Sequence, residues 1–112
     1  MGGVLMLFNK TISFTRAAVT KDLLGGEVRS FAPIAGLTNL SVSIQQEMGK
    51  VVDDFARRGV SITHAIYSRK DLSGLQVGDK GQDGDGKTYV VRFVDDMAGR
   101  GRMWCVYSEQ LS

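Results

Sequence analysis

The sequence is poor in three residue types on which many small proteins depend for cross-links or chemistry. One cysteine, one proline and one histidine occur among its 112 residues. A lone cysteine excludes an internal disulfide and a cysteine-based zinc site, and it fits a reducing compartment. The charge balance is nearly even, with a formal net charge of +2. That value alone does not indicate nucleic-acid binding, because such domains usually carry a concentrated basic face.

Long hydrophobic runs are also missing. Residues 4–8 are apolar, but this run of about five residues has no basic region before it. It is too short for a signal peptide or a membrane span, so we expect a cytosolic protein with no membrane partner. The length predicts a single domain over residues 1–112, in which residues 1–9 form an N-terminal arm.

Glycine, in contrast, is abundant. Its 14 residues are about twice the usual share, which with so little proline favours short strands joined by turns. Apolar and polar residues alternate, or mostly alternate, as in half-buried strands, in three segments: residues 12–16, 40–44 and 60–67. Residues 28–32 are expected to begin a further strand. Residues 17–26 are expected to form a loop. Pro33 is expected to end the second strand at a sheet edge or a bulge.

The last third of the chain predicts a three-stranded meander. It opens with residues 75–79, and runs of β-branched and aromatic residues then predict strands at residues 88–94 and 103–107. Two Asp-Gly pairs at residues 83–86 supply the positive φ angles that a tight turn needs. Residues 95–101 form the second turn cluster.

One segment has a helical period instead. Four apolar residues fall at i, i+3, i+4 and i+7: Met48, Val51, Val52 and Phe55. Ser43 with Gln46 suggests a capping box, and Gly59 is suited to follow the helix as its C′ residue. Gly49 inside the helix costs about 1 kcal/mol relative to alanine, so the helix is marginal alone.

Together these patterns predict a mainly β fold. Many short strands joined by glycine turns are typical of a small barrel. We expect a six-stranded β-barrel with one short α-helix inserted between the third and fourth strands. The inserted helix or loop occupies residues 45–59.

The residue types that usually perform catalysis are isolated in this sequence. His64 lies in the middle of a strand pattern, where a packed structural histidine is favoured over a catalytic one. Cys105 also lies in a strand and is favoured as a buried hydrophobic residue. Asp79, Asp83 and Asp85 suggest calcium, but an EF-hand loop starting at Asp79 or Asp83 has valine where the bidentate glutamate belongs. Turns explain them better, so neither an enzyme nor a metal or other cofactor is expected.

The inserted segment carries three cations: Lys50, Arg57 and Arg58. Glu47, Asp53 and Asp54 lie close by in the sequence, and mixed charge of this kind is typical of a solvated face. DNA contact is the alternative, and it would be weak and sensitive to salt. Outside the insertion, Trp104 is favoured as a core residue over an inter-subunit contact. Residues 99–101 are expected to form a turn.

The order of the segments is more informative than any one residue. A glycine-containing loop follows the first strand, TNLSVSIQQ leads into the insertion, and ITHAIYSR follows it. The Gly78-Asp79 turn then precedes DGKTYVVRFVDD and the final strand RMWCVYSEQ. In this order the chain resembles the head–tail joining proteins of tailed bacteriophages, also called head–tail adaptor, head-closure or stopper proteins. The resemblance covers roughly residues 10–110 through degenerate motifs.

The resemblance implies a structural protein of the virion neck, assembled in the host cytoplasm. Members of that family are small β-barrels that multimerise as a ring, here expected in six or twelve copies. The ring lies between a portal or adaptor protein on the head side and a tail terminator or tail-tube protein on the tail side. Packaged DNA passes through its centre without sequence specificity.

In some members an insertion between barrel strands points into the channel and helps to retain the DNA. Residues 45–59 match that insertion by topology, so Lys50, Arg57 and Arg58 become candidate channel residues facing DNA. The apolar face of the expected helix leaves a second arrangement open, in which the insertion packs onto the barrel.

Exposed apolar residues usually mark interfaces. Candidates for docking to partners lie in the N-terminal run and in the first loop: Leu5, Leu7, Phe8, Leu23 and Leu24. Two other functions remain open, a tail-completion ring that caps the tail tube and a small nucleic-acid-binding β-barrel. The second predicts DNA binding that weakens steeply with salt.

Overall fold

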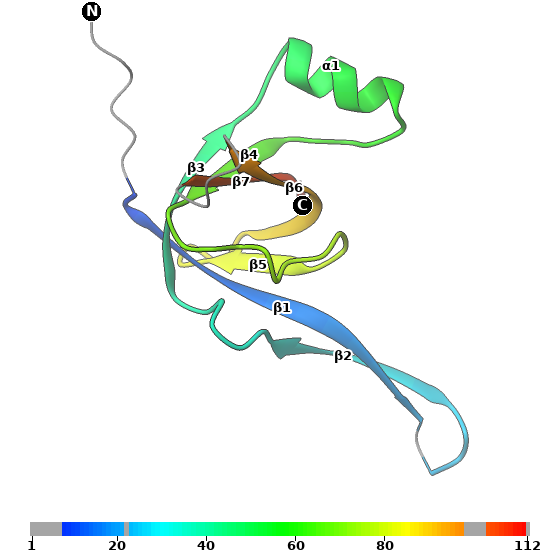
Figure 1. Cartoon of the computed structure of the whole chain (residues 1–112). Coiled ribbons are helices and arrows are strands. Elements are labelled where there is room, and N and C mark those ends of the chain that lie inside the picture. The colour runs from blue at the N-terminus through cyan, green and yellow to red at the C-terminus, as the bar shows by residue number, and fades with distance from the viewer. Residues whose placement is uncertain (1–7, 22, 98–102, 112) are drawn as a thin grey trace, which may run out of the picture.

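The structure, a computed structural model, describes residues 8–21, 23–97 and 103–111. Within these residues the chain forms seven strands and one helix (Figure 1). Their bounds are β1 Lys10–Lys21, β2 Glu27–Pro33, β3 Leu40–Gln46, α1 Lys50–Arg57, β4 His64–Ser68, β5 Lys80–Asp83, β6 Thr88–Met97 and β7 Met103–Leu111. No helix of this part of the chain has the length and apolarity to cross a membrane.

Six of the strands close into an antiparallel barrel. Their order is β1-β3-β4-β7-β6-β5, and β5 pairs in turn with β1. Closure occurs at Ile12, which lies opposite Leu40 of β3 on one side and Asp83 of β5 on the other. The prediction of a mainly β fold, a six-stranded barrel with one inserted helix, is therefore confirmed.

The barrel is filled by the inward-facing residues of its strands. The core residues of the strands are Ile12, Phe14, Leu40, Val42, Ile66, Tyr89, Val91, Trp104 and Val106. Leu37, Leu72 and Leu75 join them from loops. Trp104 is 9% exposed and belongs to this cluster, which confirms its assignment to the core. Burying each large apolar side chain contributes about 1.5–3 kcal/mol, so this cluster supplies the main stabilisation of the barrel.

β1 and β5 approach each other very closely where they close the barrel. A Cβ atom on Gly81 of β5 would lie 2.7 Å from the Cδ1 atom of Ile12 and 2.8 Å from the Cε1 atom of Phe14. Both of those side chains are fully buried. Position 81 therefore requires glycine for space.

β1 and β2 extend beyond the barrel as a two-stranded ribbon. β1 pairs with β3 and β5 over residues 10–15, and with β2 from Thr15 to Lys21. Figure 1 shows this ribbon leaving the barrel. The expectation of a loop over residues 17–26 is wrong, because the backbone of residues 17–21 forms a ladder with residues 27–31. Pro33 does end β2, and β2 is an edge strand of the sheet, as expected.

Three further boundaries differ from expectation. Residues 75–79 form turns instead of a strand, because the Asp79 carboxylate accepts the Gln76 backbone N–H at 2.8 Å and Gly78 has a φ of 97°. The first strand of the meander is instead β5, which begins at Lys80. β4 begins at His64, after a connection from the helix. Asp95–Met97 continue β6, and residues 99–101 lie outside the described residues.

Candidate partner-binding surfaces

The tip of the ribbon is apolar and fully open to solvent. The exposed fractions of Leu23 and Leu24 are 105% and 95%. They follow the end of β1, so the ladder that builds the ribbon carries them away from the barrel (Figure 1). Two adjacent leucines with that exposure are unfavourable in water, which makes the tip the clearest candidate for a partner contact. Both were predicted as docking residues from the sequence.

The other predicted docking residues lie at the N-terminus. Leu5 and Leu7 are outside the described residues. Phe8 is half-buried, and the guanidinium of Arg69 lies 4.6 Å from the centre of its ring. This cation–π contact ties Phe8 to the connection that follows β4, so the structure does not bring the arm and the ribbon tip into one described surface.

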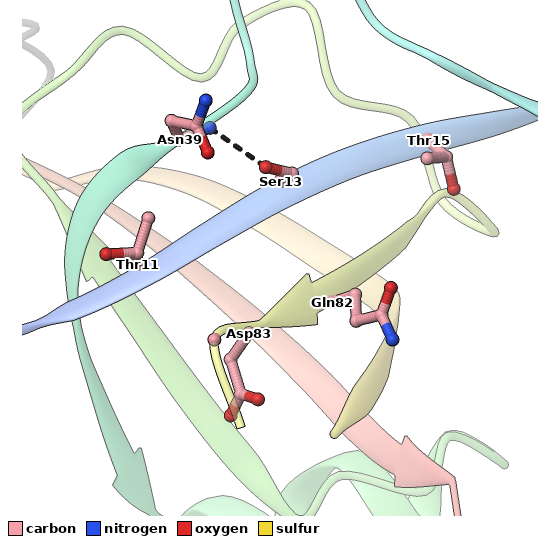
Figure 2. Close-up of a pocket in the computed structure, with 7 residues that line it drawn as sticks. Thr11, Ser13, Thr15, Asn39, Gln82 and Asp83 are labelled. Carbon is pink, nitrogen blue, oxygen red and sulfur yellow. Dashed lines mark hydrogen bonds between the residues drawn. The ribbon is translucent and has the colours of Figure 1, made fainter. Parts of the chain in front are cut away.

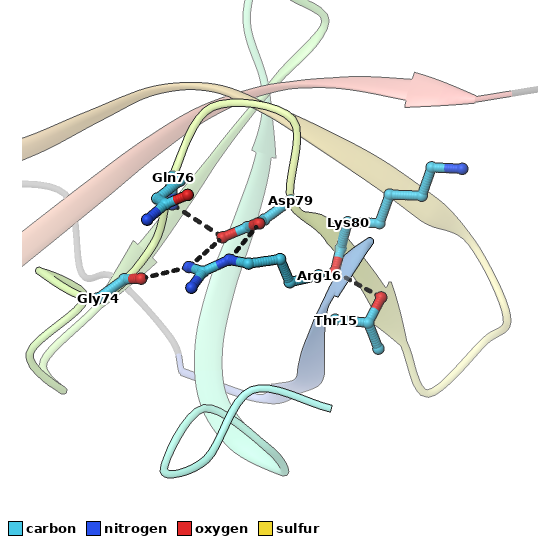
Figure 3. A network of polar contacts seen from close by, with 6 residues as sticks. All are labelled: Thr15, Arg16, Gly74, Gln76, Asp79 and Lys80. Atoms are coloured by element: carbon cyan, nitrogen blue, oxygen red, sulfur yellow. Dashed lines mark hydrogen bonds and ion pairs between the residues drawn. The ribbon is translucent and has the colours of Figure 1, made fainter. Parts of the chain in front are cut away.

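The base of the ribbon is fixed by an ion pair. The Arg16 guanidinium donates to both carboxylate oxygens of Asp79, at 3.0 and 2.9 Å, and to the Gly74 carbonyl at 2.6 Å (Figure 3). The Asp79 side chain is only 4% exposed, and the Asp79 hydrogen bond raises the pKa of Arg16. The Thr15 hydroxyl also donates to the Lys80 carbonyl. The ribbon therefore leaves the barrel from a rigid base.

The inserted helix is delimited by two glycines in the left-handed region. Gly49 precedes it with a φ of 74°, and Gly59 follows it with a φ of 79°. At the C-terminus, the N–H of Gly59 donates to the Ala56 carbonyl and that of Val60 to the Phe55 carbonyl, which is a Schellman motif. Gly59 is therefore the C′ residue, as predicted.

The beginning of the helix differs from expectation. The helix starts at Lys50, with Gly49 as its N-cap, and Met48 precedes the helix with an exposed fraction of 76%. Ser43 and Gln46 belong to β3 and form no capping box. Residues 45 and 46 are thus part of the barrel, and the insertion proper runs from Glu47 to Thr63.

Phe55 of the helix contacts two aromatic side chains on the outside of the barrel. The Phe55 ring lies 5.1 Å from that of Tyr107 on β7 and 5.8 Å from that of Phe93 on β6, measured between ring centres. No residue of α1 is buried, and Phe93 is 43% exposed. Offset aromatic pairs contribute about 0.5–1.5 kcal/mol beyond their burial, so this attachment is weak.

The predicted channel residues lie on this insertion. Lys50 begins the helix, Arg57 ends it and Arg58 is its C-cap, and all three are exposed. The Arg58 guanidinium lies 5.8 Å from the centre of the Phe55 ring. The structure therefore brings these cations onto one projecting element, together with Asp53.

The surface is hollowed beside the insertion and beside β1. An apolar groove of about 260 Å³ lies beneath the helix, lined by Val52, Ala56, Gly59, Val60, Ser61 and Ile62. A polar cleft of about 250 Å³ lies where β1 passes β5, lined by Thr11, Ser13, Thr15, Asn39, Gln82, Asp83 and Gly84. Figure 2 shows its polar side chains. The backbone N–H of Asn39 donates to the Ser13 hydroxyl at 2.9 Å.

The single cysteine lies on the outer face of the sheet. Trp104 and Val106 point into the core, so the Cys105 side chain points outward, where it hydrogen-bonds Tyr67 and Tyr107. It is 1% exposed. Burial raises the pKa of Cys105 to about 11 and that of Tyr107 to about 12. The thiol therefore stays protonated near neutral pH, in agreement with the predicted inert, buried cysteine.

The single histidine is held by its neighbours. His64 Nδ1 lies 2.9 Å from the Thr63 hydroxyl, and its ring meets the Tyr89 ring edge-on at 5.3 Å between centres. Burial, and to a lesser extent Lys87, lowers the pKa of His64. These contacts confirm a packed, hydrogen-bonded histidine.

The aspartates of the first meander turn have structural partners. Asp83 accepts the backbone N–H groups of Asp85 and Lys87 at 2.9 Å and the Tyr89 hydroxyl at 3.3 Å. This confirms the turn interpretation, although only Gly86 of the two glycines expected to have positive φ does so, at 86°. In the described ranges, no group of three or more His, Cys, Asp or Glu residues suits a metal ion.

Some residues of these surfaces were missed by sequence analysis. Arg16 and Asp79 are 63 positions apart, and no local pattern connects them. Phe31 is 43% exposed on β2, with the Lys80 ammonium 4.3 Å from its ring centre. An aromatic residue in a strand pattern gives no signal of whether its face is buried. No family model matches the chain, and no curated protein matches it either.

Proposed function

We propose that the chain is a structural protein of the tailed-bacteriophage neck, whose copies form a ring that joins the DNA-filled head to the tail. The observation that carries this proposal is a small closed barrel from which two unlike elements project. One is the ribbon β1–β2 with Leu23 and Leu24 at its tip, and the other is the helix α1 (Figure 1). The segment order described above supplies the link to phage head–tail joining proteins.

A joining ring needs surfaces of several kinds. Each subunit must contact two neighbours, one partner on the head side and one on the tail side, and unlike patches are required for a head-to-tail ring. The barrel provides a rigid body, and the Arg16–Asp79 ion pair fixes the direction of the ribbon. The ribbon tip then docks to the portal, adaptor or tail protein by burying its two leucines.

The inserted helix is the element proposed to face the DNA. It has no buried residue and is flanked by Gly49 and Gly59, so it adds a charged projection without contributing to the core. Arg57 and Arg58 attract the DNA backbone, and Asp53 moderates that attraction. A balanced, weak interaction suits a channel that holds the packaged DNA and through which the DNA must pass during ejection.

Deletion of this reading frame from its parent phage or prophage tests the function directly. The lysate is imaged by electron microscopy. DNA-filled heads beside separate free tails would support joining, and heads that have lost their DNA would add retention. Free tails of abnormal length would favour the tail-capping ring instead. Normal, infectious particles would refute the neck function.

Complementation of the deletion then tests the role of the helix. Replacing both Arg57 and Arg58 by glutamine should reduce the fraction of DNA-filled heads and leave the barrel folded, because both side chains are exposed. The matched control replaces Lys70 and Lys87 by glutamine, which removes the same charge from exposed positions on loops of the barrel. Equal effects of the two pairs would exclude a specific role for the helix in DNA retention.

A further inference from the structure

The ribbon has two strand edges that make no ladder within the described residues. β2 pairs there with β1 alone, and residues 16–21 of β1 pair with β2 alone. A two-stranded ribbon is marginally stable by itself, and open edges are templates for another strand. Both edges belong to the same ribbon and run antiparallel to each other.

The direction of the backbone groups along these edges follows from one hydrogen bond. The Ile34 N–H donates to the Phe14 carbonyl at 3.0 Å, which makes 14 and 34 a hydrogen-bonded pair. Antiparallel ladders alternate between bonded and non-bonded pairs, so the next pair, Thr15 and Pro33, is non-bonded. Pro33 fits this assignment because it has no N–H to donate.

Continuing the alternation shows which pairs along the whole ribbon are hydrogen-bonded. Ala18 and Ser30 face each other as a bonded pair, whereas Ala17 and Phe31 form a non-bonded pair. The N–H and C=O groups of Phe31 therefore point away from β1, and those of Ala17 point away from β2. The two edges thus offer unpaired donors and acceptors in opposite directions.

We propose that the ribbons of neighbouring copies pair edge to edge, with β2 of one copy against β1 of the next, to form a continuous antiparallel sheet around the ring. When all ribbons point the same way, β2 lies beside the neighbour's β1, and the two run antiparallel because β1 and β2 already do. The same contact repeats between every pair of copies, as a ring requires. This inference deepens the proposed function, since it names the surface through which the ring closes.

The unpaired backbone groups along the ribbon edges favour an extended strand as the binding partner. Alternating backbone donors and acceptors are satisfied by another strand, in the manner of β-augmentation. A second copy of this chain supplies the complementary edge at equal concentration and with matching length and direction.

Proline substitution tests the pairing at a single backbone group. Phe31→Pro removes an outward N–H and leaves every β1–β2 hydrogen bond in place. Phe31→Ala is the matched control, which loses the phenyl ring and keeps the N–H. Sedimentation velocity and native mass spectrometry of the purified chain from micromolar to millimolar concentration report self-association. We expect Phe31→Pro to weaken it about tenfold or more, and Phe31→Ala to stay within about threefold of wild type.

Hydrogen exchange supplies an independent readout on the unaltered chain. The amides of Phe31 and Ala17 should exchange freely in the monomer and become protected in the assembly. Those of Ser30 and Ala18, bonded inside the ribbon, should be protected in both states. Unchanged urea unfolding of the proline variant shows that its barrel is intact.

Three results would overturn the edge pairing. The first is a Phe31→Pro chain that self-associates as wild type does and still joins heads to tails, and the second is a wild-type chain that stays monomeric at every concentration. The third is a Phe31→Pro chain that self-associates as wild type does but fails to join heads to tails, which would assign the edge to a strand of another neck protein. The deletion phenotype is measured separately, so the joining function can stand when the edge pairing fails.

Discussion

Alanine at position 81 provides a sharp test of the barrel closure. Gly81 lies where β5 meets β1, and an added Cβ atom would come within 3.0 Å of atoms in both Ile12 and Phe14. Those side chains are fully buried, so they must leave their preferred positions to admit the methyl group. Overpacking of this kind costs about 1–3 kcal/mol.

The matched control is Gly84→Ala in the following turn. No atom lies within 4 Å of a Cβ at that position, and its backbone is outside the left-handed region. Alanine there should be neutral or stabilise by about 0.4–1 kcal/mol, through the lower entropy of the unfolded chain. The difference between the free energies of unfolding of the two variants therefore separates the cost of the close approach from the general effect of replacing glycine.

A second substitution identifies the colliding atom. Ile12→Val removes the Cδ1 atom that lies 2.7 Å from the added methyl group. Alone it should cost about 0.5–1.5 kcal/mol. In the Gly81→Ala background it should cost almost nothing, because it relieves the collision. This non-additivity is the signature of a direct contact.

Urea unfolding followed by tryptophan fluorescence measures the free energies of unfolding of the wild type and the four variants. A loss of 1 kcal/mol lowers the Tm of a domain near this size by about 4–8 °C, so thermal unfolding is an adequate second assay. A Gly81→Ala variant as stable as Gly84→Ala would refute the close approach of β1 and β5. Strict additivity with Ile12→Val would refute the assignment of the contact.

Four further predictions concern single residues. Trp104→Ala should lower the free energy of unfolding by roughly 3–5 kcal/mol, and a loss below about 1 kcal/mol in urea unfolding would contradict its burial. The raised pKa of Cys105, about 11 against 9.0 for a free thiol, means that stability is complete below pH 9 and falls as pH rises toward 11. Urea midpoints across this range should fall less steeply in Cys105→Ser. The His64 pKa measured by NMR should lie below 6.5 and rise in Lys87→Gln, whereas no change on substitution would exclude the electrostatic effect of that lysine. Leu23→Asp should leave the unfolding midpoint unchanged and reduce the yield of joined particles, and normal joining would remove the tip from the docking surface.

The parts of the fold that were predicted from sequence are those with a local physical signal. Alternation marked the first part of β3, because Leu40 and Val42 are buried and Ser41 between them is exposed. Gly59 was identified because a helix C-terminus needs a residue that tolerates positive φ. The extension of β1 gave no such signal, since Ala17 and Ala18 are both exposed and the pattern of period two disappears when neither face is buried.

The remaining errors concern pairs of residues that are distant in sequence. Residues 80–83 form a strand because β1 and β6 pair with them, despite a composition typical of turns. The Arg16–Asp79 ion pair also depends on that closure. Leu23 and Leu24 were predicted as docking residues because they are apolar residues in an expected loop, and exposed apolar residues usually mark interfaces. Their exposure supports a docking role, and the partner itself remains a proposal.

The continuity of β1 has a mechanical consequence. The same strand forms one side of the ribbon and part of the barrel wall, where it is hydrogen-bonded to β3 and β5. A pull on the ribbon tip therefore acts along the axis of β1 and loads its ladders in shear. Hydrogen bonds loaded in shear must break together, whereas those at a strand end pulled sideways break one after another. A subunit built in this way transmits tension from its tip into its most stable part without passing it through a hinge.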